Sequence, residues 1–478
     1  MLFNSIEFLC FLPIVFLLYW YVFRRLQLQN LFIVVVSYVF YGWWNRTFLL
    51  LIAFTTICSF VSGILIEREF EKRGKLAKAY TSANIGVNLL VLGVYKYYDF
   101  FASSLSDAFH GVGLNVQVES LGLVLPVGIS FYTFQALSYT IDVYRRKLQP
   151  THNPIEFFAF ISFFPQLVAG PIERATNLLP QFQKSRIFKY EDAVDGTRQI
   201  LWGLFKKMVI ADNCAIVVNN IFENYQTLDS LTLLYGAFMF CFQIYGDFSG
   251  YSDIAIGTAK LFGIKLMRNF NYPYFSRSIP EFWRRWHISL NTWFTDYIYI
   301  PLGGSRCGRW KVIRNTIIVF FVSGLWHGAN WTFICWGLYH GFLFLPYLLL
   351  NKKTKFVDDV AAHSYFPSFK ETLQIGLTFS LVLLGWIIFR AQSITELIGY
   401  LHRIVVGWSF AIPYIEKKVT IFIVILILFE WWHRKRQFGL QFFPNKTKKV
   451  FRYTIYIVLL FSILLFSGNS TQFLYFQF

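Results

Sequence analysis

The stretch FFVSGLWHGANWTFICWGLYHG, Phe320 to Gly341, decides the fold of this chain. It is apolar and long enough to lie in a bilayer, yet it carries His327 between Trp326 and Gly328, with Asn330 close by. An ionisable ring is costly in lipid, so such residues in membrane segments are functional candidates. That interpretation requires the whole chain to be a membrane protein.

The amino-acid composition is typical of a membrane protein. Of 478 residues, 56% are hydrophobic and 15% are charged, whereas soluble domains average about 45–50% apolar and about 25% charged residues. Crossing the hydrocarbon core takes about 20 apolar residues in a helix. We therefore predict an all-α polytopic membrane protein with a first, uncleaved span at residues 3–23. Further charge-poor stretches lie at residues 31–44, 48–66, 83–95, 121–141, 373–389, 420–429 and 454–467.

The net charge of +18 does not indicate a nucleic-acid partner, because the basic residues lie between the apolar stretches. Lys and Arg gather in the cytoplasmic loops of membrane proteins. Residues 99–119 contain acids but no Lys or Arg, and are therefore expected outside. The predicted orientation has the N-terminus outside. The basic loops that support it contain Arg24, Arg25, Arg68, Lys72, Arg73, Lys75, Lys78, Arg145, Arg146 and Lys147.

Three later segments do not look like simple spans. Residues 152–174, interrupted by prolines and glycine, are predicted to be re-entrant, and residues 280–302 to form one amphipathic helix dipping in from the cytoplasm. Residues 315–350 are predicted to form a hairpin or a deep re-entry bent around Gly328–Asn330. Irregular backbone at membrane depth must be buried in protein. We predict one membrane-embedded domain over residues 1–478, with simple spans in 1–147, a core in 148–350 and C-terminal spans in 351–478.

The depth of His327 suits a buried base. It follows Arg314 by 13 residues, or about 20 Å of helix, roughly two-thirds of the way through a core about 30 Å thick. His287, after Trp286, has a similar setting. A buried neutral histidine can take a proton from a hydroxyl and return one to a leaving group. The alternatives are a hydrogen bond between helices or, less favoured, a metal held with His340.

Two other polar sets have structural alternatives. Asp247, Ser249, Ser252 and Asp253 lie on the stretch 231–262 and are predicted to form a structural network with a buried base, or else to orient a catalytic histidine. In the re-entrant segment, Gln166, Gly170, Glu173 and Arg174 form either part of a donor mouth or a helix-breaking packing motif.

Seven motifs, in order along the chain, resemble those of the membrane-bound O-acyltransferase family. The resemblance is greatest to the bacterial branch that contains the alginate O-acetylation and teichoic-acid D-alanyl transfer membrane proteins. The motifs are YGWW at 41–44, LPVGISFYTFQALSYTIDVYR at 125–145, FFPQLVAGPIER at 163–174, YGDFSGYSDIAIG at 245–257, FWRRWHISLNTWFTDYIYIPLGG at 282–304, SGLWHGANWTF at 323–333 and the terminal FLYFQF.

This resemblance implies about 11 or more helices, with re-entrant or interfacial segments, around an intramembrane tunnel. It places His327 at the family's WHG histidine and His287 at its second catalytic position. It also implies acetyl-CoA as donor substrate and no permanently bound cofactor or metal. Arg309 and Lys311 would join the basic residues that bind the CoA phosphates. The alternative for each residue of this cluster is the excess of basic residues that any cytoplasmic loop carries. The further donor or tunnel candidates are Trp286, Trp326, Asn291, Asn330, Arg284, Arg285, Arg306, Gln166 and Asp247.

The implied activity is a membrane O-acetyltransferase in a bacterial inner membrane. It would pass acetyl from cytoplasmic acetyl-CoA to an outer-side acceptor or to a separate outer-side acetyltransferase partner. The final product would be an O-acetylated exported or cell-wall polysaccharide, whose identity the residues do not indicate. The alternatives are a polytopic transporter, for which no internal repeat is found, and a non-catalytic scaffold for an outer-side acetyltransferase.

Overall fold

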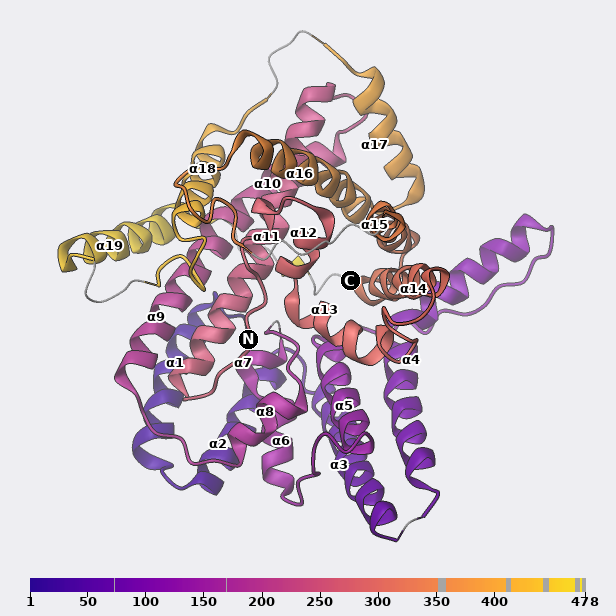
Figure 1. The fold of residues 1–478 in the computed structure, drawn as a ribbon, viewed down its shortest axis with the longest axis vertical. Coiled ribbons are helices and arrows are strands. Elements are labelled where there is room, and N and C mark those ends of the chain that lie inside the picture. The colour runs from indigo at the N-terminus through magenta and orange to yellow at the C-terminus, as the bar shows by residue number, and fades with distance from the viewer. Residues whose placement is uncertain are drawn as a thin grey trace. The chain divides into compact units, whose positions relative to one another are not determined.

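Helices form the regular secondary structure of the described residues (Figure 1). The computed structural model describes residues 1–72, 74–168, 170–350, 358–409, 414–441, 447–468 and 473–474, and it contains no strand within them. The all-α prediction is confirmed. Among the described helices, five are long and apolar enough to cross a membrane: α3 (Phe48–Glu71), α11 (Ser230–Leu261), α15 (Trp331–Leu349), α16 (Phe369–Arg390) and α19 (Lys449–Phe466).

The chain divides into two compact units. Unit 1 comprises Met1–Val194 and Thr258–Met267. In this unit α3 packs against both α4 and α5, and α2 packs against α6. Its helices, besides α3, are α1 (Ile6–Leu17, extended by a π-helix at Leu18–Val22), α2 (Leu26–Gly42), α4 (Ala77–Gly111), α5 (Ile129–Tyr144), α6 (Pro154–Ser162), α7 (Phe164–Leu167), α8 (Ala175–Phe182) and the start of α9 (Tyr190–Leu204).

Unit 2 comprises Asp195–Gly257 and Arg268–Phe478 and holds both Trp-His motifs. Within it α14 packs against α15, and α15 packs against α16. Besides the C-terminal part of α9 and most of α11, its helices are the π-helix Phe205–Ala211, α10 (Asp212–Glu223), the 3-10 turn Pro273–Phe275, α12 (Ile279–Arg285), α13 (Ile288–Phe294), the π-helix Thr295–Tyr299, α14 (Arg309–His327), α15, α16, α17 (Ile394–Val406), α18 (Lys417–Trp432) and α19.

Two predicted elements differ from the structure. The segment 280–302 is not one amphipathic helix, because α12 ends at Arg285 and α13 begins only at Ile288, with His287 in a left-handed conformation (φ 44°) between them. The stretch 121–141 is helical only from Ile129, the first residue after Gly128, whose φ of 74° suits a glycine before a helix.

The predicted hairpin is confirmed. Helix α14 ends at His327, and α15 begins at Trp331 after a cap in which the Asn330 side chain accepts from the Thr332 N–H. The two helices approach closely because Gly324 of α14 and Gly337 of α15, which have no side chain, lie where the helices meet. A Cβ at Gly324 would lie 2.4 Å from the Phe333 carbonyl oxygen, and one at Gly337 would lie 2.3 Å from that of Phe320.

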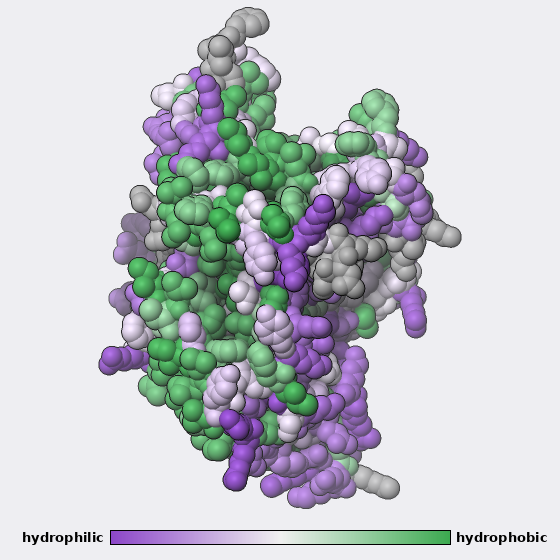
Figure 2. All heavy atoms as spheres, turned by 90° about the vertical axis from the view of Figure 1, so that its left-hand side faces the viewer, coloured by the Kyte–Doolittle hydropathy of each residue, from purple (hydrophilic) through white to green (hydrophobic). Residues whose placement is uncertain are grey.

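Many apolar side chains face outward. Figure 2 shows them over much of one face of the molecule. Ile6 of α1, Leu377 of α16 and Leu464 of α19 are 78%, 66% and 75% exposed. Soluble monomers rarely expose contiguous apolar surface on this scale, so these faces are suited to lipid.

Candidate functional site

His327 lies in an aromatic enclosure within unit 2. The residue is 3% exposed at the C-terminal end of α14. Its ring meets the ring of Trp336 on α15 edge to face, with centroids 4.8 Å apart, and that of Phe389 on α16 at 5.3 Å. Helices α15 and α16 thus each place an aromatic ring against the histidine, which is buried from solvent.

The structure places both motif histidines on one indole. The centroid of Trp326 lies 4.9 Å from that of His327 and 5.6 Å from that of His287. His287 is 1% exposed and also packs edge to face on Phe248 of α11, at 4.6 Å. Residues 40 positions apart in the sequence therefore share one buried site.

His287 has a left-handed backbone conformation at the turn between α12 and α13. A non-glycine residue in that conformation costs about 1–2 kcal/mol, and such conformations concentrate at functional sites. Trp286 precedes it in extended conformation, so the chain turns sharply between α12 and α13. Asn291 holds the turn by donating its side-chain N–H groups to the carbonyls of Trp283 and Trp286.

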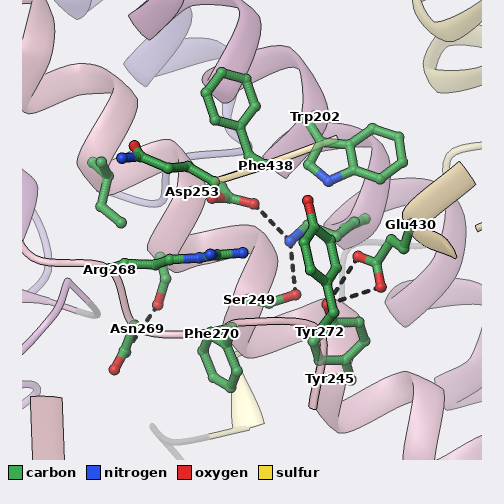
Figure 3. Close-up of a pocket in the computed structure, with 14 residues that line it drawn as sticks. Trp202, Tyr245, Ser249, Asp253, Arg268, Asn269, Phe270, Tyr272, Glu430 and Phe438 are labelled. Carbon is green, nitrogen blue, oxygen red and sulfur yellow. Dashed lines mark hydrogen bonds and ion pairs between the residues drawn. The ribbon is translucent and has the colours of Figure 1, made fainter. Parts of the chain in front are cut away.

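A small pocket lined largely by polar and aromatic side chains lies in the same unit (Figure 3), and we refer to it as the cavity. In Figure 3, Asp253 and Arg268 lie on one side of it, and Glu430 with Tyr245 lies on the other. The Tyr245 hydroxyl donates to Glu430 at 2.8 Å. Burial raises the pKa of the Tyr272 phenol and lowers that of the Arg268 guanidinium. Arg268 lies 5.1 Å from the Tyr272 ring centre.

Two consecutive buried lysines belong to the π-helix Phe205–Ala211. Lys206 lines the cavity and pairs with Asp253 at 2.6 Å, while Lys207 pairs with Asp212 at 2.8 Å and Asp247 at 2.7 Å. Side chains of consecutive residues point about 100° apart on a regular helix, and π-turns are frequent at functional sites. The predicted structural network of Asp247 and Asp253 with a base is therefore present, and each aspartate is bonded to a lysine.

Asn269 connects the cavity to His287. Its side-chain N–H donates to Ser252 at 3.2 Å, and its side-chain oxygen lies 3.2 Å from His287 Nδ1. Asn269 is 1% exposed and lines the cavity. A polar residue from the connection between α11 and α12 thus orients the histidine.

Comparison with known proteins agrees with these features. The profile of the MBOAT, membrane-bound O-acyltransferase family matches residues 136–358. The probable alginate O-acetylase AlgI of Pseudomonas aeruginosa is 40% identical over 397 residues, covering 82% of this chain and 73% of that protein. The peptidoglycan O-acetyltransferase of Helicobacter pylori is 33% identical, covering 88% and 83%. The chain belongs to the membrane-bound O-acyltransferase family.

The chain is also similar to a more distant protein. The teichoic acid D-alanyltransferase of Bacillus subtilis is 32% identical over 288 residues, covering 56% of this chain and 70% of that protein. Proteins named for acetyl transfer and a protein named for D-alanyl transfer are thus both similar to this chain. Membership makes this chain a membrane acyltransferase, and the family region, residues 136–358, contains both histidines.

The remaining candidates for the acyltransferase site are arranged in three ways. Trp286 is buried against Trp386 at 4.8 Å, in unit 2 with the histidines. Asn291 and Asn330 hold the breaks at the α12–α13 turn and the α14–α15 turn, where Asn330 also donates to the Gln392 carbonyl at 2.7 Å. Gln166 belongs to unit 1, where it is fully buried and bonded to Gln135 at 3.0 Å.

The basic candidates divide by exposure. Arg285 is bonded to Glu281 at 3.0 Å and lies 3.6 Å from Asp359, so its charge is already compensated. The exposed basic side chains are those of Arg284, Arg306, Arg309 and Lys311. A role for these residues in binding donor phosphates stays a prediction.

The sequence did not single out several residues of this acyltransferase core. Asn269 lies 18 residues from His287, and no motif spacing connects them. Arg268, Glu430 and the two lysines carry charge in or beside apolar helices. That signal, an ionisable residue in a membrane segment, could have identified Lys206, Lys207 and Glu430, but not their partners.

Proposed function

We propose that this chain takes an acetyl group from cytoplasmic acetyl-CoA through an intramembrane tunnel and delivers it toward the outer side. His327 acts as the base and His287 as the second catalytic residue. The final product is an O-acetylated exported or cell-wall polysaccharide, formed directly or through a separate outer-side acetyltransferase. The membrane is a bacterial inner membrane, and the N-terminus lies outside.

The chemistry needs one proton to move twice. His327 removes the proton of an acceptor hydroxyl, whose oxygen attacks the thioester carbonyl carbon. The bond from carbon to sulfur then breaks, and the histidinium returns the proton to the thiolate of CoA. No oxidant, reductant or metal is required for this balance. The aromatic rings around His327 keep water, the competing acceptor, away from the thioester.

One observation carries the proposal: His287 and His327, from separate broken segments, meet on the Trp326 ring in a buried site. The names of the alginate and peptidoglycan relatives support acetyl as the group and a polysaccharide as the final acceptor. The basic side chains exposed at residues 306–311 support an anionic donor.

The test uses purified protein in nanodiscs with acetyl-labelled acetyl-CoA, and follows CoA release and label transfer to a supplied outer-side acceptor. Wild type is compared with His327→Ala and His287→Ala, and with His402→Ala, in which an exposed histidine of α17 is removed. We expect the first variant to lose roughly 100-fold or more in rate, and the α17 variant to match wild type.

Three outcomes would contradict the proposal in whole or in part. Full turnover in folded His327→Ala protein would exclude this ring as the base. Outer-side acetylation in cells that survives both histidine substitutions would support a non-catalytic scaffold instead. Transfer of labelled D-alanyl from a D-alanyl thioester, with no transfer from acetyl-CoA, would keep the base but replace the donor.

A further inference from the structure

Asn269 is bonded to three successive residues around the break between α12 and α13. Its backbone carbonyl accepts from the Ile288 N–H at 2.9 Å. Its side-chain oxygen accepts from the Ser289 N–H at 3.3 Å and from the Ser289 hydroxyl at 2.9 Å. It also lies 3.2 Å from His287 Nδ1. The amide group is buried, so its orientation is set by these partners.

The Ser289 backbone decides which end of the amide faces His287. A backbone N–H can only donate a hydrogen bond, so the Asn269 atom that it meets must be the oxygen and not the NH₂ group. The opposite end agrees, because the NH₂ group then points to the Ser252 hydroxyl, which can accept. The amide orientation therefore follows from chemistry.

That orientation fixes the tautomer of the histidine. An amide oxygen has no proton to give, so a ring nitrogen 3.2 Å away makes a favourable contact only if it carries the proton. In a neutral imidazole one nitrogen is a donor and the other an acceptor. With the proton on Nδ1, the lone pair of His287 lies on Nε2.

We propose that Asn269 is a positioning residue that holds His287 in the Nδ1–H tautomer and so presents Nε2 as its basic nitrogen. This inference rests on the proposed participation of His287 in acyl transfer. Asn269 acts through His287 and is assigned no contact with the substrate.

The neutral amide suits this task better than the acids nearby. A carboxylate facing the ring would favour the charged imidazolium, which cannot accept a proton. Asp247 and Asp253 on the neighbouring helix α11 are instead bonded to Lys207 and Lys206. The polar network therefore keeps both acids paired with lysines while an uncharged side chain orients the histidine.

The test combines a spectroscopic signature with rates. The full chain is labelled with ¹⁵N-histidine in nanodiscs, and solid-state NMR reads which ring nitrogen of His287 carries the proton, the signal being assigned by its loss in His287→Gln. Wild type is compared with Asn269→Leu, which removes the acceptor, and Asn269→Asp, which keeps it. Ser252→Ala is the control that removes only the partner of the NH₂ group.

We expect the neutral Nδ1–H form in wild type and Ser252→Ala, and a mixture or the Nε2–H form in Asn269→Leu. In Asn269→Asp the Nδ1 proton should be kept, with a larger share of imidazolium. Loss of the hydrogen bond that orients a metal-bound histidine typically lowers activity roughly 10–100-fold, and a wrong tautomer in a Ser-His-Asp triad can cost more, so we expect a loss of at least the smaller size here. The kcat for acetyl transfer should fall in Asn269→Leu with the KM for acetyl-CoA unchanged. Asn269→Asp should recover part of the rate.

Three results would overturn the inference. One is an Nε2–H form of His287 in wild type, which decides the matter whether or not the Asn269 variants fold. Another is an unchanged His287 tautomer in folded Asn269→Leu. The third is a further loss of rate when Asn269→Leu is added to His287→Gln, since a positioning residue has nothing left to position there. Full activity in His287→Gln would instead refute the catalytic role of His287, while the spectrum would still test the contact with Asn269.

Discussion

At the scale of single residues, the ion pairs of the π-helix Phe205–Ala211 explain how this core tolerates charge. Lys206 and Lys207 are 3% and 0% exposed, deep among apolar helices. Removing one member of a buried ion pair typically costs about 3–5 kcal/mol, because the remaining charge stays buried and uncompensated. The free-energy cost of removing one member is expected to be largest at Lys207, which forms ion pairs with two carboxylates.

We therefore expect Lys207→Met to destabilise unit 2 by about 3–5 kcal/mol. The substitution leaves Asp212 and Asp247 close together without their shared cation. Thermal unfolding in detergent, followed by tryptophan fluorescence, measures the shift in midpoint. Lys184→Met, at an exposed lysine, is the matched control and should change stability by less than about 0.5 kcal/mol. Equal midpoints for both variants would show that the buried cluster does not stabilise the fold.

Part of the candidate site could be predicted from individual residues in the sequence. The two Trp-His motifs identify His287 and His327, because a titratable ring in an apolar segment stands out in the sequence. Asn269 does not stand out, because an asparagine in a connection between helices is ordinary. Its importance comes from the Ser289 N–H and His287 Nδ1 that it meets in space.

At the scale of elements, the α14–α15 break is caused by residues at the break itself, whereas the α12–α13 break is held by residues outside the break. The α14–α15 break follows from Gly328 and from Asn330, which caps the next helix, so the sequence predicted it. The α12–α13 break has no glycine or proline at Trp286 or His287. It is held by bonds from Asn269 and Asn291, and local propensity therefore predicted one continuous helix.

We expect Gly324→Ala and Gly337→Ala to force α14 and α15 apart. A methyl group at either position would lie within 2.4 Å of a carbonyl oxygen on the facing helix. The expected loss of stability is about 1–3 kcal/mol, with reduced acyl transfer because His327 lies three residues beyond Gly324. Thermal unfolding and labelled acetyl transfer check both effects.

The control for this pair is Gly376→Ala on α16, where an added Cβ meets no atom within 4 Å. Alanine is the better helix former by roughly 1 kcal/mol, so this variant should be as stable as wild type or more stable. Wild-type stability and activity in Gly324→Ala would contradict a tightly packed hairpin.

At the scale of the whole molecule, the exposed apolar faces and the distribution of basic loops describe a protein built for a bilayer. Helix α4 has 35 residues, or about 52 Å at 1.5 Å per residue. That is longer than a hydrocarbon core of about 30 Å. Its two ends are therefore expected on opposite sides of the membrane, which gives a direct test of orientation.

In a variant with all six cysteines replaced, we expect a single cysteine at Asp107 to react with a membrane-impermeant maleimide on intact cells. A single cysteine at Lys75, before the other end of α4, should react only after lysis. Both positions are exposed. The reverse pattern would place the N-terminus in the cytoplasm and contradict the orientation predicted from the basic loops.

The sequence by itself determined the class of protein, its helical architecture, the α14–α15 hairpin and the membership of the acyltransferase family. Apolar length, helix breakers and motifs act over short stretches of chain, so they can be read in order. Only the tertiary structure brought His287 and His327 onto Trp326, assigned Asp247 and Asp253 to separate lysines, and placed Asn269 against His287. Those contacts depend on which helix faces meet, and burial then enforces the pairing because a polar group left alone there is costly.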